Sequence, residues 1–364
     1  MKKLFLICLF LLQLLAGCSK TLNVLPRSLY FLDGPKDSKQ VWRLEKDGKT
    51  FSQITFEEKG VENFDVSSVD GSTALISDNK LFLVDPKSQN HRLIVDGNLV
   101  EAEGEEWYFK NSINNPSFSP DGHTLAYGLD GLHLYNLSSG ENDHVLSNLG
   151  NLMGEPFVYA KEVYSPGPWS PDGSMLLFTM SYYEGFTLAV MNPGVKDSFV
   201  RLLSDGALCC LISWTSDSQS ILVANPYFTG TLPGLWKFDA HSGQQTTLVS
   251  GHIEDRSVNF VGWPYQSSKG DLFFFHLLFD WFSIDQGIPL FLVKSDENGS
   301  NMKKILPDEF RISDAVWSPD GSIVVVVGRY GSTEDQLFIV YPETGDIQVL
   351  IEHGNLIRAL TWGP

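Results

Sequence analysis

The sequence WSPDGSMLLFTM at residues 169–180 joins an aromatic residue, a tight turn and a short apolar run. The combination recurs as FSPDG from Phe118 and WSPDG from Trp317, with degenerate copies SSVDG at 67–71, WTSDSQ at 214–219 and WPYQSSKG at 263–270. Proline fixes φ at about −65° at the second turn position, and glycine supplies the positive φ that leads into the next strand. The motif therefore predicts a turn between two strands and belongs to the scaffold.

The anchor position ahead of this turn recurs at a nearly constant period. It is occupied by Ser67, Phe118, Trp169, Trp214, Trp263, Trp317 and, in ALTW near the C-terminus, Trp362; successive anchors lie 51, 51, 45, 49, 54 and 45 residues apart. Each full unit continues with further apolar runs rich in Val, Ile, Phe and Tyr, which are typical of strands and show no helical periodicity. Four strands per unit at this period predict a β-propeller.

The first unit lacks its first strand. The run at 28–34 is expected to be a second strand, 40–50 a third strand with its turn, and 51–55 a fourth strand, whereas 359–362 is a first strand with nothing after it. We therefore predict an all-β, seven-bladed β-propeller of four-stranded blades, with the ring closed by the C-terminal strand 359–362 completing the N-terminal blade. Closure would also remove most of the exposed sheet edge.

The Trp-Ser-Pro-Asp-Gly-x-apolar pattern resembles the TolB-type propeller repeat, found in periplasmic propellers and in the propeller domains of prolyl-oligopeptidase-like proteins. The resemblance covers nearly all of the chain after Cys18 and is strongest in the three blades that begin at Phe118, Trp169 and Trp317. TolB also has an N-terminal α/β domain, for which the stretch between Cys18 and Ser28 leaves no room. The resemblance implies the fold, and propellers host many functions.

The N-terminus has the pattern of an export signal. Lys2 and Lys3 precede an apolar run at 4–16, which is too short to span a bilayer. Leu15-Ala16-Gly17-Cys18 resembles the bacterial lipobox, in which the cysteine is acylated and becomes the first residue; the alternative is an ordinary signal peptide. We expect a lipoprotein signal peptide at 1–17, a lipidated tether at 18–27 and one TolB-like propeller domain at 28–364. The protein would be extracytoplasmic and membrane-anchored, at the outer membrane and periplasm or at the cell surface.

Composition limits the partners. The chain has 364 residues, of which 43% are hydrophobic, so a sizeable core is available; 26 basic against 44 acidic residues give a net charge of −18. An acidic protein repels phosphate backbones, so we expect no nucleic-acid partner. Apart from the cysteines of the signal region, only Cys209 and Cys210 remain, which excludes a disulfide framework. They are two thiols on opposite faces of a strand, a vicinal disulfide or ligands of a soft metal, and the first is favoured.

No motif for catalysis appears in the sequence. HExxH, GxSxG, a Walker-type glycine loop and a CxxC pair are all absent, and the eight histidines are scattered. We therefore predict no catalytic residues, no metal site and no cofactor.

Long connections that interrupt the economical repeat are the best candidates for a binding site. They carry exposed aromatic and acidic residues, a combination found at interfaces and sugar platforms. The predicted ligand-binding residues are Trp107, Tyr182, Tyr183, Phe186, Tyr227, Phe228, Trp281, Asp280 and Asp285. The alternative is that these aromatics pack over the ends of the blades.

Two classes of function stay open. The first is a non-enzymatic, membrane-anchored binding or scaffold module that presents its loop-rich face to a protein, peptide or glycan. The second is a propeller enzyme, such as a glycan lyase or hydrolase, with acidic groups in the central funnel. The absent motifs favour the first, and the acidic loops favour a neutral or cationic partner.

Overall fold

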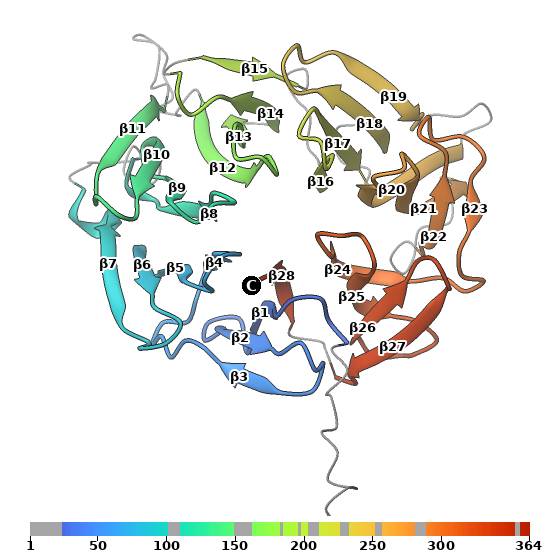
Figure 1. Cartoon of the computed structure of the whole chain (residues 1–364), viewed down its shortest axis with the longest axis horizontal. Coiled ribbons are helices and arrows are strands. Elements are labelled where there is room, and N and C mark those ends of the chain that lie inside the picture. The colour runs from blue at the N-terminus through green and yellow to red at the C-terminus, as the bar shows by residue number, and fades with distance from the viewer. Residues whose placement is uncertain are drawn as a thin grey trace, which may run out of the picture.

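The computed structural model describes residues 24–100, 110–148, 162–182, 185–195, 198–202, 211–225, 233–251, 257–280, 289–353 and 357–364. These ranges contain strands β1 to β28 and one short 3-10 helix, η1 (Gly97–Leu99). The strands form seven four-stranded antiparallel sheets, arranged as blades around a central axis (Figure 1). Within the described ranges, no helix has the length and apolarity needed to cross a membrane. The predicted all-β, seven-bladed propeller is confirmed.

Each blade is a meander whose first strand lies nearest the axis (Figure 1). Blade 1 consists of β28 (Arg358–Trp362), β1 (Leu29–Asp33), β2 (Gln40–Leu44) and β3 (Phe51–Gln53). Blade 2 consists of β4 (Asn63–Val66), β5 (Thr73–Ser77), β6 (Lys80–Val84) and β7 (His91–Asp96). Blade 3 consists of β8 (Asn114–Phe118), β9 (Thr124–Gly128), β10 (Gly131–Asn136) and β11 (Asn142–Ser147). Blade 4 consists of β12 (Val163–Trp169), β13 (Leu176–Tyr182), β14 (Gly185–Met191) and β15 (Phe199–Arg201).

The remaining blades repeat the same order. Blade 5 consists of β16 (Leu211–Trp214), β17 (Ser220–Asn225), β18 (Gly234–Asp239) and β19 (Gln245–Val249). Blade 6 consists of β20 (Ser257–Gln266), β21 (Leu272–Asp280), β22 (Phe291–Ser295) and β23 (Lys303–Lys304). Blade 7 consists of β24 (Arg311–Trp317), β25 (Val324–Arg329), β26 (Gln336–Tyr341) and β27 (Asp346–Ile351). The predicted anchors therefore end, or directly follow, the first strand in most blades, and Trp263 lies within β20.

The ring closes in blade 1, as predicted. β28 pairs antiparallel with β1, placing Trp362 opposite Leu29 and Thr361 opposite Tyr30. A backbone hydrogen bond from Gly363 to the carbonyl of Ser28, 2.9 Å long, extends the pairing beyond the strands. The closing strand begins at Arg358, one residue earlier than the sequence pattern indicated.

The repeated turn is held by its own side chains. The Ser170 hydroxyl donates to Asp172 Oδ1 at 2.6 Å and accepts from the amide of Met175 at 3.0 Å. Gly173 has φ of +74°, which confirms the predicted role of the glycine. The same 2.6 Å bond joins three other pairs: Ser119 and Asp121, Thr215 and Asp217, and Ser318 and Asp320.

The core lies between neighbouring blades. One cluster joins Phe275 and Leu292 of blade 6 to Val326 and Phe338 of blade 7, all with no exposed surface. β25, with the sequence VVVVGR, is buried along its first five residues because it packs against a blade on each side. Packing of this kind repeats around the ring and makes each blade dependent on its neighbours.

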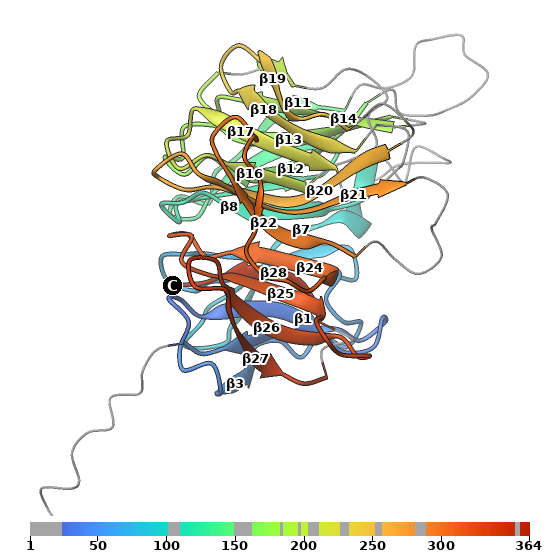
Figure 2. The ribbon, with the colours of Figure 1, turned by 90° about the vertical axis from the view of Figure 1, so that its right-hand side faces the viewer.

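The connections divide between two faces (Figure 2). We call the turn face the side that carries the turns between first and second strands, at 67–72, 119–123, 170–174, 215–219, 267–270 and 318–322, and the turns between third and fourth strands. We call the loop face the opposite side, which carries the connections between second and third strands and between blades. The C-terminus lies on the turn face, where Pro364 lies close to Gly71.

Candidate functional site: the central channel

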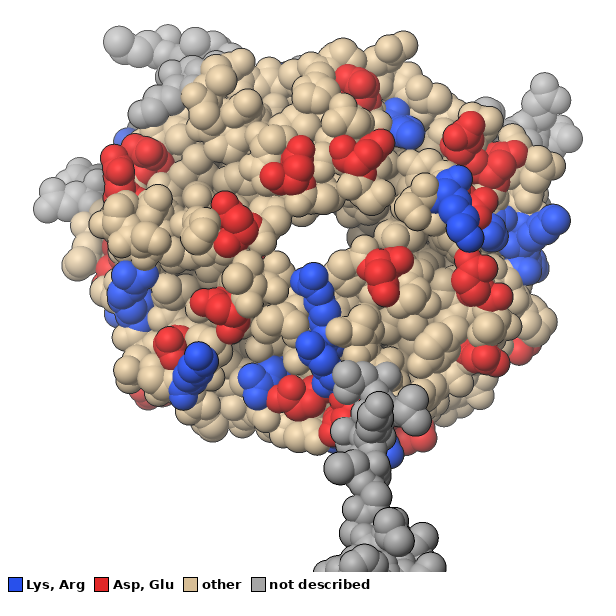
Figure 3. All heavy atoms as spheres, viewed as in Figure 1, with Lys and Arg blue, Asp and Glu red and all other residues tan. Residues whose placement is uncertain are grey.

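An open channel follows the axis of the ring (Figure 3). The channel consists of two cavities. One, of about 810 Å³, is lined mainly by blades 1 to 4, and the other, of about 580 Å³, is lined mainly by blades 5 to 7. They share Pro171, Val316 and Pro319, so the two volumes are contiguous. Each is within the size range of small-molecule and peptide sites in proteins.

Proline and aromatic residues dominate the wall of this channel. The lining prolines are Pro116, Pro120, Pro166, Pro168, Pro171, Pro264 and Pro319, and the lining aromatic residues are Phe64, Phe118, Trp169, Trp214, Trp263, Tyr265, Trp317 and Trp362. Pro120, Pro171 and Pro319 are the second residues of the repeated turn, so the scaffold motif itself builds the channel mouth on the turn face. Because proline has no N–H, this wall offers apolar surface and few backbone donors.

The anchor tryptophans join one blade to the next along this wall. The indole N–H of Trp169 donates to the carbonyl of Ser117 in the preceding blade at 3.1 Å. Three more indoles make the equivalent bond: Trp214 to Pro168 at 3.1 Å, Trp317 to Trp263 at 2.9 Å and Trp362 to Trp317 at 2.7 Å. A buried indole thus satisfies its only donor while its ring fills the wedge between two sheets.

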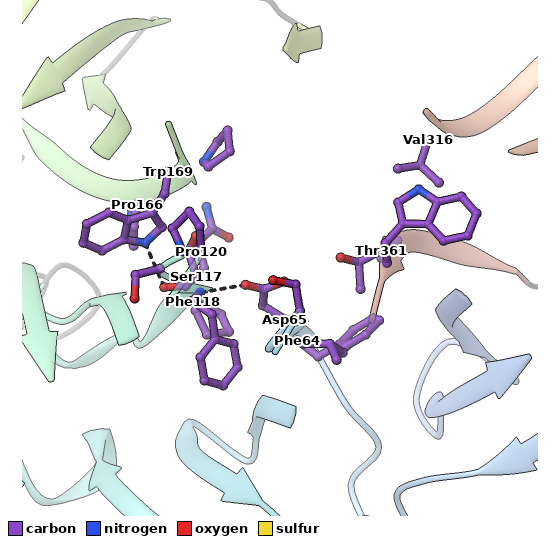
Figure 4. A pocket seen from close by; sticks show the side chains of 18 of the residues that line it. Phe64, Asp65, Ser117, Phe118, Pro120, Pro166, Trp169, Val316 and Thr361 are labelled. Atoms are coloured by element: carbon purple, nitrogen blue, oxygen red, sulfur yellow. Dashed lines mark hydrogen bonds between the residues drawn. The ribbon is translucent and has the colours of Figure 1, made fainter. Parts of the chain in front are cut away.

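The anchor that faces blade 2 is Phe118 of blade 3, which has no side-chain N–H to donate, and a carboxylate of blade 2 makes this joint instead. Asp65 Oδ2, on β4, accepts the amide N–H of Phe118 on the first strand of blade 3 at 2.7 Å (Figure 4). The carboxyl also hydrogen-bonds with the Thr361 side chain of blade 1. Burial in the channel wall raises the pKa of Asp65 to about 6, against the opposing effect of these hydrogen bonds.

The peptide unit between Ser117 and Phe118 of blade 3 is therefore hydrogen-bonded to both neighbouring blades. The Ser117 carbonyl accepts from Trp169, and the Phe118 amide of the same peptide donates to Asp65 (Figure 4). The C=O and N–H of a trans peptide point in opposite directions, so the two contacts pull along one line across the strand. The geometry fixes the inner strand of blade 3 at the channel wall.

A second buried carboxylate lies on the other side of β28. Asp314 Oδ2, on β24, accepts the amide of Leu360 on β28 at 3.1 Å, which ties blade 7 to the closing strand. Burial raises the pKa of Asp314 as well. Asp65 and Asp314 thus face β28 from its two neighbouring blades.

The mouth of the channel on the turn face is acidic. Acidic side chains surround the opening in Figure 3, and the carboxylates of the repeated turns are Asp70, Asp121, Asp172, Asp217 and Asp320. Hydrogen bonds from neighbouring hydroxyls lower the pKa of Asp121, Asp172 and Asp217, to about 2 for Asp172. At Asp70 and Asp320 burial acts in the other direction, but hydrogen bonds outweigh it and their pKa values are also lowered. All five are ionised at neutral pH, and Arg27 adds one basic group to the channel lining.

Most of the sequence-predicted ligand residues lie outside the described part of the chain. These are Trp107, Tyr183, Tyr227, Phe228, Trp281 and Asp285; Cys18, Cys209 and Cys210 also lie outside it. Tyr182 and Asp280 end β13 and β21, and only their backbone is described. Phe186 is half-buried on β14, opposite Ser181 of β13, at the loop-face end of that hairpin. The binding role of all nine stays a prediction.

Sequence reasoning did not identify the channel wall. Asp65 and Asp314 lie two and three residues before their anchors, on strands that are otherwise mostly apolar or neutral. A lone acidic residue on an inner strand was the available signal. Among the described residues, no three His, Cys, Asp or Glu side chains are grouped so that they could hold a metal ion.

Fold and channel together define the chain as a seven-bladed β-propeller with an open, proline- and aromatic-lined axis. No family model matches the sequence, and no curated protein matches it. Solved structures with a similar fold include a prolyl endopeptidase, at 13% identity and a TM-score of 0.61 over 93% of this chain and 49% of the other. They also include an oligogalacturonate lyase in complex with manganese, at 14% identity and a TM-score of 0.56 over 88% of this chain and 83% of the other. TolB from Acinetobacter baumannii matches at 14% identity and a TM-score of 0.47, over 92% and 82%.

These similarities concern the fold. The chain spans about half the length of the prolyl endopeptidase and of a puromycin hydrolase that it also resembles, at 13% identity and a TM-score of 0.60. Enzymes therefore occur among proteins of this fold, and at these identities the similarity carries no residue roles to this chain.

Proposed function

We propose that this protein is a membrane-tethered, extracytoplasmic binding module that holds a segment of its partner in the central channel. The tether is the acylated Cys18, which follows the basic and apolar segments expected of an export signal. Two or more acyl chains on one cysteine would give stable anchoring, whereas one chain gives marginal binding.

The contiguous channel volume is the observation that carries this proposal. Its proline and aromatic wall suits a neutral, extended segment of peptide or glycan, and the ionised turn carboxylates at the mouth favour a segment with positive charge. The aromatic and acidic residues of the loop face, including Trp281 and Tyr183, would add contacts at the other end of the axis. Affinity for a cationic partner should fall as salt is added, because the mouth is exposed to solvent.

A defined probe tests the channel directly. A phage-displayed library of random peptides would be selected on the purified protein, and the selected peptides would then be measured against Ser117→Trp. Ser117 lines the cavity and its backbone carbonyl, which holds Trp169, is unchanged by the substitution. Ser138→Trp, on the exposed turn between β10 and β11 of the same blade, is the matched control.

We expect Ser117→Trp to abolish binding and Ser138→Trp to leave it unchanged. Peptides that are lost with Trp281→Ala and Tyr183→Ala but bind Ser117→Trp normally would move the site to the loop face. Acylation is tested separately by mass spectrometry of the membrane fraction, with Cys18→Ala as control. An unmodified chain that starts elsewhere would refute the tether.

A glycan lyase or hydrolase is the second candidate function. The similar fold of an oligogalacturonate lyase, 83% of which is covered by this chain, favours it. Release of unsaturated or reducing ends from a panel of acidic and neutral polysaccharides would support the enzyme and contradict the binding module.

A further inference from the structure

We infer that the ring is oriented on the membrane, with its turn face and the acidic channel mouth toward the bilayer and its loop face away. The inference rests on the proposed acylation of Cys18. The observation that supports it is the place where the chain joins the ring, at Val24 and Leu25 of blade 1.

The chain enters the ring on the turn face of blade 1. The amides of Val24 and Leu25 both donate to the carbonyl of Lys46, at 2.8 Å and 3.0 Å, and Lys46 belongs to the turn between β2 and β3. Leu25 is 1% exposed and packs in the cluster that contains Leu29 and Trp362. Gly48 lies close against the Val24 side chain. Residues 24 and 25 are therefore part of the scaffold and add no slack to a tether.

Covalent geometry limits the reach of what precedes Val24. Six residue steps separate Cys18 from Val24, and a fully extended chain spans at most about 3.6 Å per residue, or about 22 Å in all. A strand such as β26, with six residues, is itself about 20 Å long. A tether that starts on the turn face would be used up in running the length of one blade to the loop face. The loop face therefore cannot lie against the bilayer in which Cys18 is anchored.

This orientation gives the two ends of the channel different surroundings. The turn-face mouth, with its ring of ionised aspartates, opens onto the gap between ring and bilayer. The loop face, with Phe186 and the other predicted ligand residues, is presented to partners in the aqueous space. A channel ligand that enters at the turn face must come from the membrane side.

Blade 7 offers a matched pair of label positions. Glu343, on the turn between β26 and β27, is exposed on the turn face; Thr333, between β25 and β26, is exposed on the loop face. Each would be replaced by Cys in full-length, acylated protein whose Cys209 and Cys210 are replaced by Ser, and labelled with a donor fluorophore. Phosphatidylcholine vesicles would carry a rhodamine-labelled phosphatidylethanolamine as acceptor. A ketone-bearing amino acid at the same positions gives the same comparison if that background does not fold.

We expect energy transfer to the lipid to be at least about twofold higher from position 343 than from 333, because one strand of about 20 Å separates them. Insertion of a flexible linker of about 30 residues after Cys18 should bring the two efficiencies together. Equal or reversed transfer in vesicle-bound protein, or a difference that survives the linker, would overturn the orientation. Protein that does not float with the vesicles would instead refute the anchoring on which the orientation depends.

Discussion

Blade 3 is joined to its two neighbours by different chemistry. On the blade 4 side, the Trp169 indole donates to the Ser117 carbonyl; on the blade 2 side, Asp65 accepts from the Phe118 amide. The indole joint combines a hydrogen bond with a large apolar ring, and it does not titrate. The carboxylate joint is compact and depends on pH, because burial raises the pKa of Asp65 to about 6. The same wedge between blades can thus be closed by two designs with different sensitivities.

Sequence explains which joint uses which design. The joint between blades 3 and 4 has Trp169 at the anchor, whereas the joint between blades 2 and 3 has Phe118, whose ring has no N–H to donate to the preceding blade. The closing strand uses both, because Trp362 donates to the Trp317 carbonyl while Asp314 accepts from Leu360. The joint between blades 7 and 1 therefore allows the contributions of the indole and of the carboxylate to be compared at one place.

Removal of residues 358–364 should have the largest effect. It deletes β28, takes away the indole of Trp362 and exposes the edge of β1. We expect aggregation or loss of a cooperative melting transition. Trp362→Ala alone, which retains the strand, should cost roughly 3–5 kcal/mol. A truncated chain that melts like the full protein would show that β28 is not needed for closure.

Trp169→Ala should come next and isolates an indole joint inside the ring. Loss of a buried tryptophan costs roughly 3–5 kcal/mol, measured as a fall in the free energy of unfolding in urea. Trp169→Phe keeps most of the apolar ring and loses the bond to Ser117, so it should cost about 1 kcal/mol or somewhat more. If both substitutions cost the same, the hydrogen bond and not the ring dominates the joint.

Asp65→Asn tests the carboxylate joint through pH. The folded-state pKa of about 6 lies above the usual value of about 3.9, so the folded state binds the proton more tightly than the unfolded state. Stability from this group is complete below about pH 4 and is lost as pH rises through 6, by at most about 3 kcal/mol. Asparagine still accepts from Phe118 and does not ionise. The variant should gain stability relative to wild type between pH 4 and 7, and identical pH profiles would contradict the assignment.

Ser170→Ala should have the smallest effect of the four. It removes the donor to Asp172 and the acceptor for the buried Met175 amide, at a cost of about 1–2 kcal/mol. The pKa of Asp172, about 2 in the intact turn, should rise toward its ordinary value, which NMR titration would measure. Ser174→Ala, which removes only an exposed contact to the same carboxylate, is the control. An unchanged Asp172 pKa in Ser170→Ala would show that the hydrogen bonds from the Ser174 amide and hydroxyl are enough to set it.

The architecture was predictable because the repeat encodes it locally. Each Ser-Pro-Asp-Gly turn specifies two strand ends, and the unmatched runs at 28–34 and 359–362 require each other; the structure confirms both inferences. Degenerate copies were also placed correctly: in WTSDSQ, Ser218 takes φ of +62° in place of the glycine. Periodicity predicts the strands and turns because every unit must form the same four-stranded sheet with the same tight turn.

The channel is harder to predict from the sequence, because its lining residues belong to the repeated motif and have a structural role there. Pro120, Pro171 and Pro319 form the repeated turns that the sequence predicts, and they also line the cavity. The partners of Asp65, on β8 and β28, lie 53 residues ahead and close to the opposite end of the chain. No local pattern predicts contacts over such separations; they follow from the number of blades and the register of closure.

Closure between β28 and β1 also affects how the ring can be made. Trp362 lies 333 residues after Leu29, its partner across the joint, so the final contact has a very high sequence separation. Such contacts slow folding, because a long loop must be ordered before they form. As the chain emerges during synthesis, the edge of β1 stays unpaired until almost every other residue of the chain has been made. Blade 1 is therefore first to emerge and last to be completed, and a chaperone that covers the β1 edge would protect the chain at its most vulnerable stage.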